Sequence, residues 1–568
     1  MGRLIKEHTM SRGEERLTME NDGRLRKLII VGGGSSGWMS AAYLCKALNF
    51  SVDITLIESP TIGRIGVGEA TIPTIKEELF DFLGIPEEEW MAECKATYKL
   101  GIRFQNWKKP ASQGGDHYYH NFGEMPLVKG MPLSHVWMYK HQQQGYSLSL
   151  DYACYHASAL SDAKKSPRYM DGTRALHHAY HFDALLIANY LKEWSIARGL
   201  THITDDVVGT ELDEGGNIKS LRGASGRTYE ADLYIDCSGF AGLLIEKALG
   251  EPKVSFHECL LTDRAVAINI PENPEAEGIR PYTTATAFSS GWTWEIPLYN
   301  RSGNGYVYSS AFQTPEDAER EIRAWFGKKA ERLDVRHIRF ISGRRRRSWV
   351  KNCVSIGLSS SFLEPLESTG LYFVYAALYQ LVSYFPNKRI DPVLRDKFNE
   401  RMAYMVDDVR DFIVLHFCTS PRTDTPYWRA NQHDLKLPDT LQEILELQRA
   451  GVPIRRSYHS NETLYASFEA AFDRFWTNSN FQSIFAGVNY LPKQPMPLLW
   501  HRQDILHDAE RVFHDIKLKT AQMMARLPSQ YEYLTALYAR GSEHGEESGP
   551  PANGGLELGE SGASGPGL

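Results

Sequence analysis

The sequence of 568 residues predicts an α/β protein with a nucleotide-binding parallel sheet and a second, mainly helical module packed closely against it. Two observations favour this class. A short apolar strand, a glycine-rich turn and a helix follow one another near the N-terminus, and two further apolar strands ending in small residues come much later. A chain of this length also exceeds one simple core, so we expect two or three modules in close contact.

The first strand is predicted at residues 27–31, and a GxGxxG turn at residues 32–37 follows it directly, before a helix over residues 38–48. A second strand, at residues 52–57, leads into Glu58, which lies 21 residues after Gly37. An acidic side chain at this spacing reaches a ribose hydroxyl in dinucleotide-binding folds. We therefore predict that the dinucleotide is bound by Gly32, Gly34, Ser35, Gly37 and Glu58.

The later strands distinguish between flavin and nicotinamide. Residues 232–239 and 354–358 each return an apolar strand to the nucleotide, which favours FAD in an extended pose, and no second GxGxxG offers a site for NAD(P)H. We therefore expect the flavin to arrive reduced, from a separate NAD(P)H-dependent flavin reductase. A glycine-punctuated loop at residues 62–73 is expected to close over the cofactor. Further predicted cofactor contacts are Arg64, Glu69, Ala70, Val207, Leu358 and Leu371.

The segment from Leu358 to Phe373 carries the strongest chemical signal. A long apolar helix begins near Leu371, so the free amides at its start can hold an anion on neutral groups. Glu364 and Glu367 stand just before this start and would repel an anion unless they point to the other side. The segment then forms a wall between two compartments; the simpler alternative is a helix cap after a surface loop.

Composition excludes several classes of protein. A net charge of −7 and a pI of about 6.3 give no basic footprint for nucleic acid. The seven cysteines form no CxxC pair, so we expect neither a metal site nor a disulfide framework, and no apolar run is long enough for a membrane span. A cytoplasmic location is expected. The predicted organisation is a disordered extension (1–26), an FAD box (27–385) with inserted substrate-contacting segments near 95–180, a helical substrate module (386–535) and a disordered tail (536–568).

Three motifs together resemble those of the flavin-dependent tryptophan halogenases. They are the GxGxxG turn, the sequence GVGEATIP at residues 66–73 and WxWxIP at residues 292–297. The resemblance spans residues 27 to about 502. It implies an FAD box with a helical substrate module, a homodimer, and chlorination or bromination of an electron-rich ring by use of reduced FAD, oxygen and halide.

The resemblance also assigns roles to residues of this sequence. The catalytic lysine falls on Lys99, within residues 97–104, and the catalytic glutamate on Glu367, within LEPLEST. Halide is expected at the amides of Thr369 and Gly370. Lys99 would hydrogen-bond hypochlorous acid or carry it as a chloramine, and Glu367 would help remove the ring proton. The implied substrate residues are His120, Phe122, Tyr465, Phe475 and Trp476.

The sequence departs from the family where members that take free tryptophan hold its amino-acid group. Their Tyr-Tyr pair reads Leu464-Tyr465 here, and the following glutamate is Ala471. Loss of one charged hydrogen-bond partner costs about 1.5–3 kcal/mol. We therefore favour tryptophan within a peptide natural product of the lanthipeptide type. The alternatives are free L-tryptophan, another indole or a phenol, and, more distantly, a flavin hydroxylase or a non-catalytic flavoprotein that binds a peptide.

Overall fold

The computed structural model describes residues 23–63, 66, 68–455 and 475–547. A six-stranded sheet with the order β10-β2-β1-β14-β23-β22 forms the nucleotide-binding part, and its first five strands run parallel. These strands are β10 (Thr201–Thr204), β2 (Asp53–Glu58), β1 (Lys27–Val31), β14 (Leu233–Asp236), β23 (Cys353–Ser355) and β22 (Trp349–Val350). Helix α2 (Ser35–Ala47) follows the glycine turn, so the predicted strand–turn–helix unit and the α/β class are confirmed.

A seven-stranded sheet lies beside the first and is antiparallel except where β17 meets β5. In sheet order its strands are β20 (Val335–Arg339), β16 (Arg264–Pro271), β19 (Arg301–Tyr308), β18 (Gly291–Pro297), β17 (Thr283–Ala287), β5 (Gly101–Gln105) and β6 (His117–Asn121). A small sheet, β3 (Glu69–Ala70), β9 (Ala179–Phe182) and β4 (Thr97–Lys99), carries Lys99.

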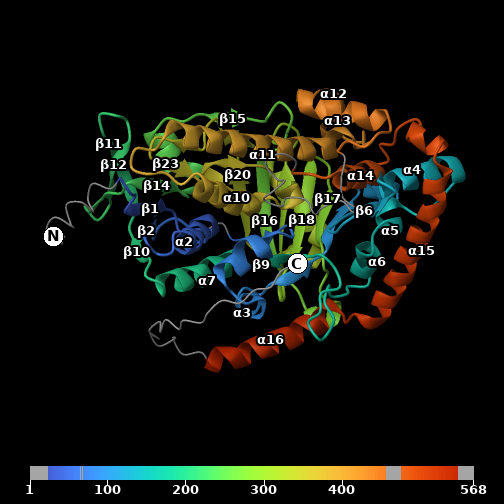
Figure 1. Cartoon of the computed structure of the whole chain (residues 1–568), viewed down its shortest axis with the longest axis horizontal. Coiled ribbons are helices and arrows are strands. Elements are labelled where there is room, and N and C mark those ends of the chain that lie inside the picture. Colours follow the sequence, from blue (N-terminus) through green and yellow to red (C-terminus); the bar gives the residue numbers. More distant parts are fainter. Residues whose placement is uncertain (1–22, 64–65, 67, 456–474, 548–568) are drawn as a thin grey trace, which may run out of the picture.

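Helices from two distant parts of the sequence cover the far end of the seven-stranded sheet. In Figure 1 the helix α11 (Pro392–Cys418) runs across the molecule, and α15 (Gln503–Arg526) lies along the edge beside α4, α5 and α6 (Ala157–Asp162). One apolar cluster joins α15 to α4 (Leu133–Gln144) and α5 (Leu150–Ala153), which belong to the predicted insertion near 95–180. The remaining helices of this part are α12 (Pro426–His433), α13 (Asp439–Arg449) and α14 (Asn478–Gly487). Among the described residues, no helix is both long enough and apolar enough to cross a bilayer.

The C-terminal region differs from the prediction of a disordered tail after residue 535. Helix α16 (Gln530–Glu547) continues through the first twelve residues of that tail. Its buried face holds Leu534 and Leu537, and the Tyr538 hydroxyl donates to the carbonyl of Ala96, just before β4. These apolar residues recur at helical spacing, so the helix is stabilised by packing even though the sequence after Gly541 is poor in apolar residues.

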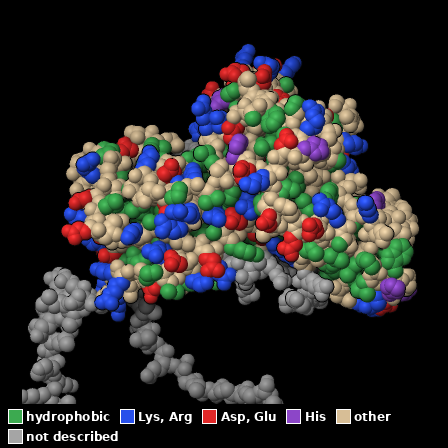
Figure 2. Space-filling view, turned by 90° about the horizontal axis from the view of Figure 1, so that it is seen from above, with side chains coloured by type: hydrophobic (Ala, Val, Ile, Leu, Met, Phe, Trp, Pro, Cys, Tyr) green, Lys and Arg blue, Asp and Glu red, His purple; other side chains and the backbone are tan. Residues whose placement is uncertain are grey.

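The surface carries charges of both signs. Figure 2 shows Lys and Arg side chains interspersed with Asp and Glu over the visible face, with hydrophobic side chains between them. The four arginines at residues 344–347 are not free surface cations. Arg344 forms an ion pair with Asp407, and Arg345 is buried and donates to Glu246 and to backbone carbonyls.

Candidate active site

The glycine turn after β1 is packed tightly on one side and open on the other. Gly32 has φ +118°, and a Cβ atom there would lie 2.3 Å from the carbonyl oxygen of Cys237, at the end of β14. A Cβ atom on Gly37 would lie 1.8 Å from the carbonyl oxygen of Gly32, whereas one on Gly34 would meet no atom of the described residues within 4 Å. The turn therefore leaves backbone amides facing open space at the start of α2, as the phosphates of a dinucleotide require.

Other predicted cofactor residues lie around this turn. Ser35 Oγ donates to the carbonyl of Ala184, and Gly357, the neighbour of Leu358, lies against Ser36. Glu58 ends β2, within 3.2 Å of His202 Nε2. Leu371 lies in the first turn of α10 (Gly370–Ser383), and Glu69 and Ala70 form β3. Val207 is the first residue of β11 (Val207–Leu212). The residue before it, Asp206, accepts a hydrogen bond from Ser59 Oγ. Arg64 lies outside the described residues.

The loop before α10 points its two carboxylates toward different partners. Ser368 has φ +60°, which turns the chain between Glu367 and the helix. Glu364 accepts hydrogen bonds from Trp292 Nε1 at 2.5 Å and from Thr262 Oγ1 at 2.8 Å, both in or near the seven-stranded sheet. Burial raises the pKa of Glu364 to about 7, although both hydrogen bonds act in the opposite direction. Trp292, from the WxWxIP motif, thus supports this loop.

Glu367 is fully buried between two histidines that come from different modules. Its Oε2 lies 2.8 Å from Nδ1 of His120, on β6, and its Oε1 lies 2.8 Å from Nε2 of His416, on α11. Burial alone would raise the pKa of Glu367, but its electrostatic contacts and hydrogen bonds with His120 and His416 outweigh burial and lower the pKa to about 2. The group is therefore held as a carboxylate.

Lys99 is also fully buried, at the end of β4, and does not lie on the strand surface. Its Nζ donates to the backbone carbonyl of Thr71 at 3.0 Å and to Ser368 Oγ at 2.7 Å. Burial lowers the pKa of Lys99 to about 7, and the negative charge of Glu367 partly offsets this effect. The motif GVGEATIP and the LEPLEST loop thus meet at the lysine.

The predicted aromatic residues gather beside these two groups. The Phe122 ring centroid lies 5.0 Å from Lys99 Nζ, and the Trp476 ring lies 6.1 Å from that of His120. Trp476 stacks on Phe412 at 4.0 Å, and Phe475 lies edge-on to Tyr372 at 4.9 Å. Both Phe475 and Trp476 are fully buried. Tyr465, Leu464 and Ala471 lie outside the described residues.

Comparison with known proteins agrees with this site. The tryptophan halogenase family model matches residues 27–504, which include the glycine turn, Lys99, Glu367 and Trp476. The chain belongs to the tryptophan halogenase family. Its members are flavin-dependent enzymes, so the predicted enzyme class is confirmed.

Named relatives match nearly the whole length of this halogenase. It is 46% identical over 529 residues to tryptophan 7-halogenase RebH of Lentzea aerocolonigenes, which covers 91% of this chain and 100% of RebH. Among solved structures, the tryptophan 6-halogenase SttH of Streptomyces toxytricini superposes with a TM-score of 0.83 at 41% identity, covering 90% of this chain and 100% of SttH. MibH, described as a lanthipeptide tryptophan 5-halogenase, gives a TM-score of 0.75 at 29% identity, covering 94% and 97%.

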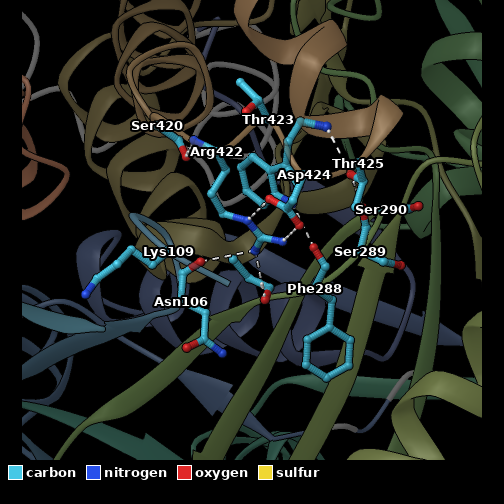
Figure 3. Close-up of polar contacts among 12 residues, drawn as sticks. Asn106, Lys109, Phe288, Ser289, Ser290, Ser420, Arg422, Thr423, Asp424 and Thr425 are labelled. Atoms are coloured by element: carbon cyan, nitrogen blue, oxygen red, sulfur yellow. Dashed lines mark hydrogen bonds and ion pairs between the residues drawn. The ribbon is translucent and has the colours of Figure 1, made fainter. Parts of the chain in front are cut away.

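The side chain of Arg422, which follows α11, connects this helix to the seven-stranded sheet of the halogenase (Figure 3). The Arg422 guanidinium donates to both carboxylate oxygens of Asp424, at 2.9 and 2.7 Å. It also donates to the carbonyls of Asn106 and Ala287, at 3.1 and 3.3 Å, which follow β5 and end β17. We call these contacts the Arg422 latch. Because the side chain is buried and spans three chain segments, it fixes the helix relative to two strands.

The latch acts close to His416. Ser420 Oγ donates to the carbonyl of Trp107 at 2.6 Å, and the Trp107 ring lies edge-on to that of His416 at 6.1 Å. The end of β5 and the end of α11 are therefore held together where His416 approaches Glu367.

Four polar groups of the site were not predicted from the sequence. Ser368 and the Thr71 carbonyl bind Lys99, His416 binds Glu367, and Asn480 Nδ2 lies 2.9 Å from His120 Nε2. A histidine among Phe412, Leu415 and other apolar residues of α11 is the one sequence signal for this set, since a buried imidazole requires a partner.

Proposed function

We propose that this halogenase chlorinates the indole ring of tryptophan by use of reduced FAD, O2 and chloride, with the flavin supplied by a separate NAD(P)H-dependent reductase. The observation that carries the proposal is the meeting of a buried amine, Lys99, and a buried carboxylate, Glu367, beside aromatic rings. Neither group is needed to bind a nucleotide, and buried ionisable groups with shifted pKa values cluster at functional sites.

The residues around the glycine turn fit FAD. The open face at Gly34, the α2 amides and Glu58 suit a pyrophosphate and a ribose, and Gly32, Ser35, Gly37, Glu69, Ala70, Val207, Leu358 and Leu371 would complete the binding surface. When bound and reduced, the flavin supplies, with O2 and chloride, the oxidised chlorine species hypochlorous acid. Thr369 and Gly370 would hold chloride, since Gly370 is exposed while Glu367, three residues earlier, is fully buried.

The side chains on the buried face would direct the chlorination. Lys99 would donate a hydrogen bond to hypochlorous acid, or carry its chlorine as a chloramine, and the Phe122, His120 and Trp476 rings would limit the orientations open to an indole. A ring carbon gains the chlorine, hydroxide leaves the oxidant, and the proton that the ring loses passes by way of Glu367 to this hydroxide, so that water forms. Glu367 would stabilise the cationic ring and accept the proton, a contribution of about 10²–10⁴-fold for a positioned base.

We further propose that the tryptophan belongs to a peptide of the lanthipeptide type. Leu464 and Ala471 support this substrate, because neither side chain can bind an ammonium or a carboxylate. Free tryptophan is the second candidate and is favoured by the names of RebH and SttH, which are similar along their full length. The relatives are named for halogenation at positions 5, 6 and 7 of the ring, so their names do not assign the position attacked by this enzyme.

A substrate panel tests both proposals. The enzyme, FAD, NADH, a reductase and chloride or bromide are incubated with L-tryptophan, N-acetyltryptophanamide and a tryptophan-containing peptide, and products are read by mass spectrometry. Chlorinated peptide or amide is expected, with little turnover of L-tryptophan at micromolar concentration. Efficient turnover of L-tryptophan beside inactive peptides would contradict the peptide proposal, and a hydroxylated product in place of a halogenated one would contradict halogenation.

A homodimer and a cytoplasmic location are likewise proposed.

A further inference from the structure

The hydrogen bonds around His120 determine which of its nitrogens carries the proton. The Thr477 backbone amide donates to Asn480 Oδ1 at 2.8 Å, so the Nδ2 side of this amide faces His120 Nε2, at 2.9 Å. An amide nitrogen can only donate, so Nε2 accepts. The ring proton of His120 is therefore on Nδ1, which donates it to Glu367 Oε2.

The contacts of His416 require one proton more than a neutral ring carries. Its Nδ1 lies 2.7 Å from the carbonyl oxygen of Phe412, which can only accept, so Nδ1 carries a proton. Its Nε2 lies 2.8 Å from Glu367 Oε1. A neutral imidazole protonated on Nδ1 presents a lone pair to that oxygen, and two acceptors repel each other. A further proton must therefore lie between Nε2 and Oε1.

The surroundings favour this proton on Nε2. Glu367 already accepts from His120 through Oε2, and a fully buried carboxylate is stable when it has a cationic partner and filled hydrogen-bonding positions. We propose that His416 is an imidazolium and the permanent counter-ion of Glu367, and that this leaves Lys99 free to be a neutral amine near neutral pH. His416 is thus a positioning residue that acts through Glu367.

The inference deepens the proposed function and rests on it, because it sets the protonation state in which Lys99 meets the oxidant. A neutral amine reacts with hypochlorous acid to give a chloramine and water, since its nitrogen lone pair takes the chlorine and its lost proton joins the leaving hydroxide. An ammonium has no lone pair and can only donate a hydrogen bond. If Lys99 were the sole cation beside Glu367, loss of its proton would leave a buried carboxylate without a counter-ion.

Two ionisable groups packed near Lys99 and Glu367 keep one charge state near neutrality. Burial, aided by Glu367, holds the pKa of the Tyr118 hydroxyl, on β6, well above its usual range. Burial, aided by Lys99, holds the pKa of His181, on β9, well below its usual range. Lys99, with a pKa of about 7, can change its charge near neutrality, and burial also raises the pKa of Glu69, on β3, and of Glu364 to about 7, so the test must follow Lys99 itself.

Nuclear magnetic resonance of the full-length enzyme tests the inference without a halogenation assay. Ring-¹⁵N histidine reports the state of His416, and ¹³Cε-lysine reports the titration of Lys99, with His416→Gln and Lys99→Met for assignment. We expect both His416 nitrogens to be protonated in the folded enzyme, as the contacts with the Phe412 carbonyl and Glu367 require. In His416→Gln, which keeps a donor but not the charge, the Lys99 midpoint should rise by at least about one unit, a tenfold change in its protonation equilibrium.

His135→Gln is the matched control, because His135 is also buried but contacts no carboxylate among the described residues, and it should leave Lys99 unchanged. A neutral His416 ring, or a Lys99 midpoint unmoved in folded His416→Gln, would overturn the inference. If the glutamine variant does not fold, His416→Asn provides the assignment and the wild-type spectra decide. Failure to chlorinate any indole would overturn the proposed function but would not affect either titration.

Discussion

Glu364 and Glu367 lie on one turn, and the same substitution should affect them in opposite ways. In Glu364→Gln the new amide can still accept from Trp292 and donate to Thr262, so the packing of the loop is kept. The carboxyl that it replaces has its pKa raised by burial from 4.5 to about 7. The folded wild type therefore holds this proton more tightly than the unfolded chain, and its stability falls as pH rises from about 4.5 to about 7.

The magnitude follows from the shift. A difference of about 2.5 pKa units corresponds to about 3 kcal/mol of unfolding free energy, fully lost by about pH 8. Glutamine does not titrate, so Glu364→Gln should gain about 3 kcal/mol relative to wild type between pH 5 and pH 8. Urea unfolding followed by tryptophan fluorescence measures this difference at each pH.

Glu367→Gln is the matched comparison. The pKa of Glu367 is lowered, to about 2, so its contribution to stability is present above about pH 4.5 and is lost only as the pH falls toward 2. This variant should be less stable than wild type at both pH 5 and pH 8, and chlorination should fall by about 10²–10⁴-fold, whereas Glu364→Gln should retain it. Two results would refute the claim that Glu364 has a structural role while Glu367 takes part in chlorination. One is a stability difference for Glu364→Gln that does not change with pH, and the other is loss of chlorination in that variant.

Three further outcomes follow from the site. Lys99→Ala should abolish chlorination while reduced flavin still yields peroxide, and persistent chlorinated product in mass spectrometry would contradict the role of the amine. Gly37→Ala should abolish retention of FAD in absorbance spectra, because its Cβ would lie 1.8 Å from the Gly32 carbonyl oxygen, whereas Gly34→Ala, which meets no atom within 4 Å, should still fold. Arg422→Met should lower the unfolding free energy by about 2–4 kcal/mol, by loss of four hydrogen bonds and one ion pair, and a urea midpoint equal to that of wild type would show that the latch contributes nothing.

Local sequence patterns were sufficient to predict the first elements of the six-stranded sheet and its glycine turn. The order of strand, glycine turn and helix depends on neighbouring residues, and β1, α2 and β2 lie within two or three residues of their predicted bounds. That both carboxylates face away from the amides of Thr369 and Gly370 stays a prediction, since an anion site and a carboxylate cannot share one side of a loop. The different partners of Glu364 and Glu367 were not predicted from the sequence.

The partners of Glu367 and His120 could not be predicted from local sequence patterns. His416 reaches Glu367 across 49 residues of sequence, and Asn480 reaches His120 across 360, so only the packed fold brings them together. Helix α16 was missed for a related reason. Its apolar face is stabilised by contact with α3 (Glu87–Glu93) and β4, whereas the composition after Gly541 is typical of a disordered tail.

The hydrogen bond from Tyr538 to Ala96 has a consequence for biosynthesis. These residues are 442 positions apart, and the one that comes later supports the strand that ends in Lys99. A ribosome releases the FAD-binding segments first, so a nascent chain acquires the parts that handle reduced flavin well before the lysine strand has its final support. The order of synthesis therefore delays completion of the lysine site until α16 has been synthesised, and a chain cut short before α16 would lack that support.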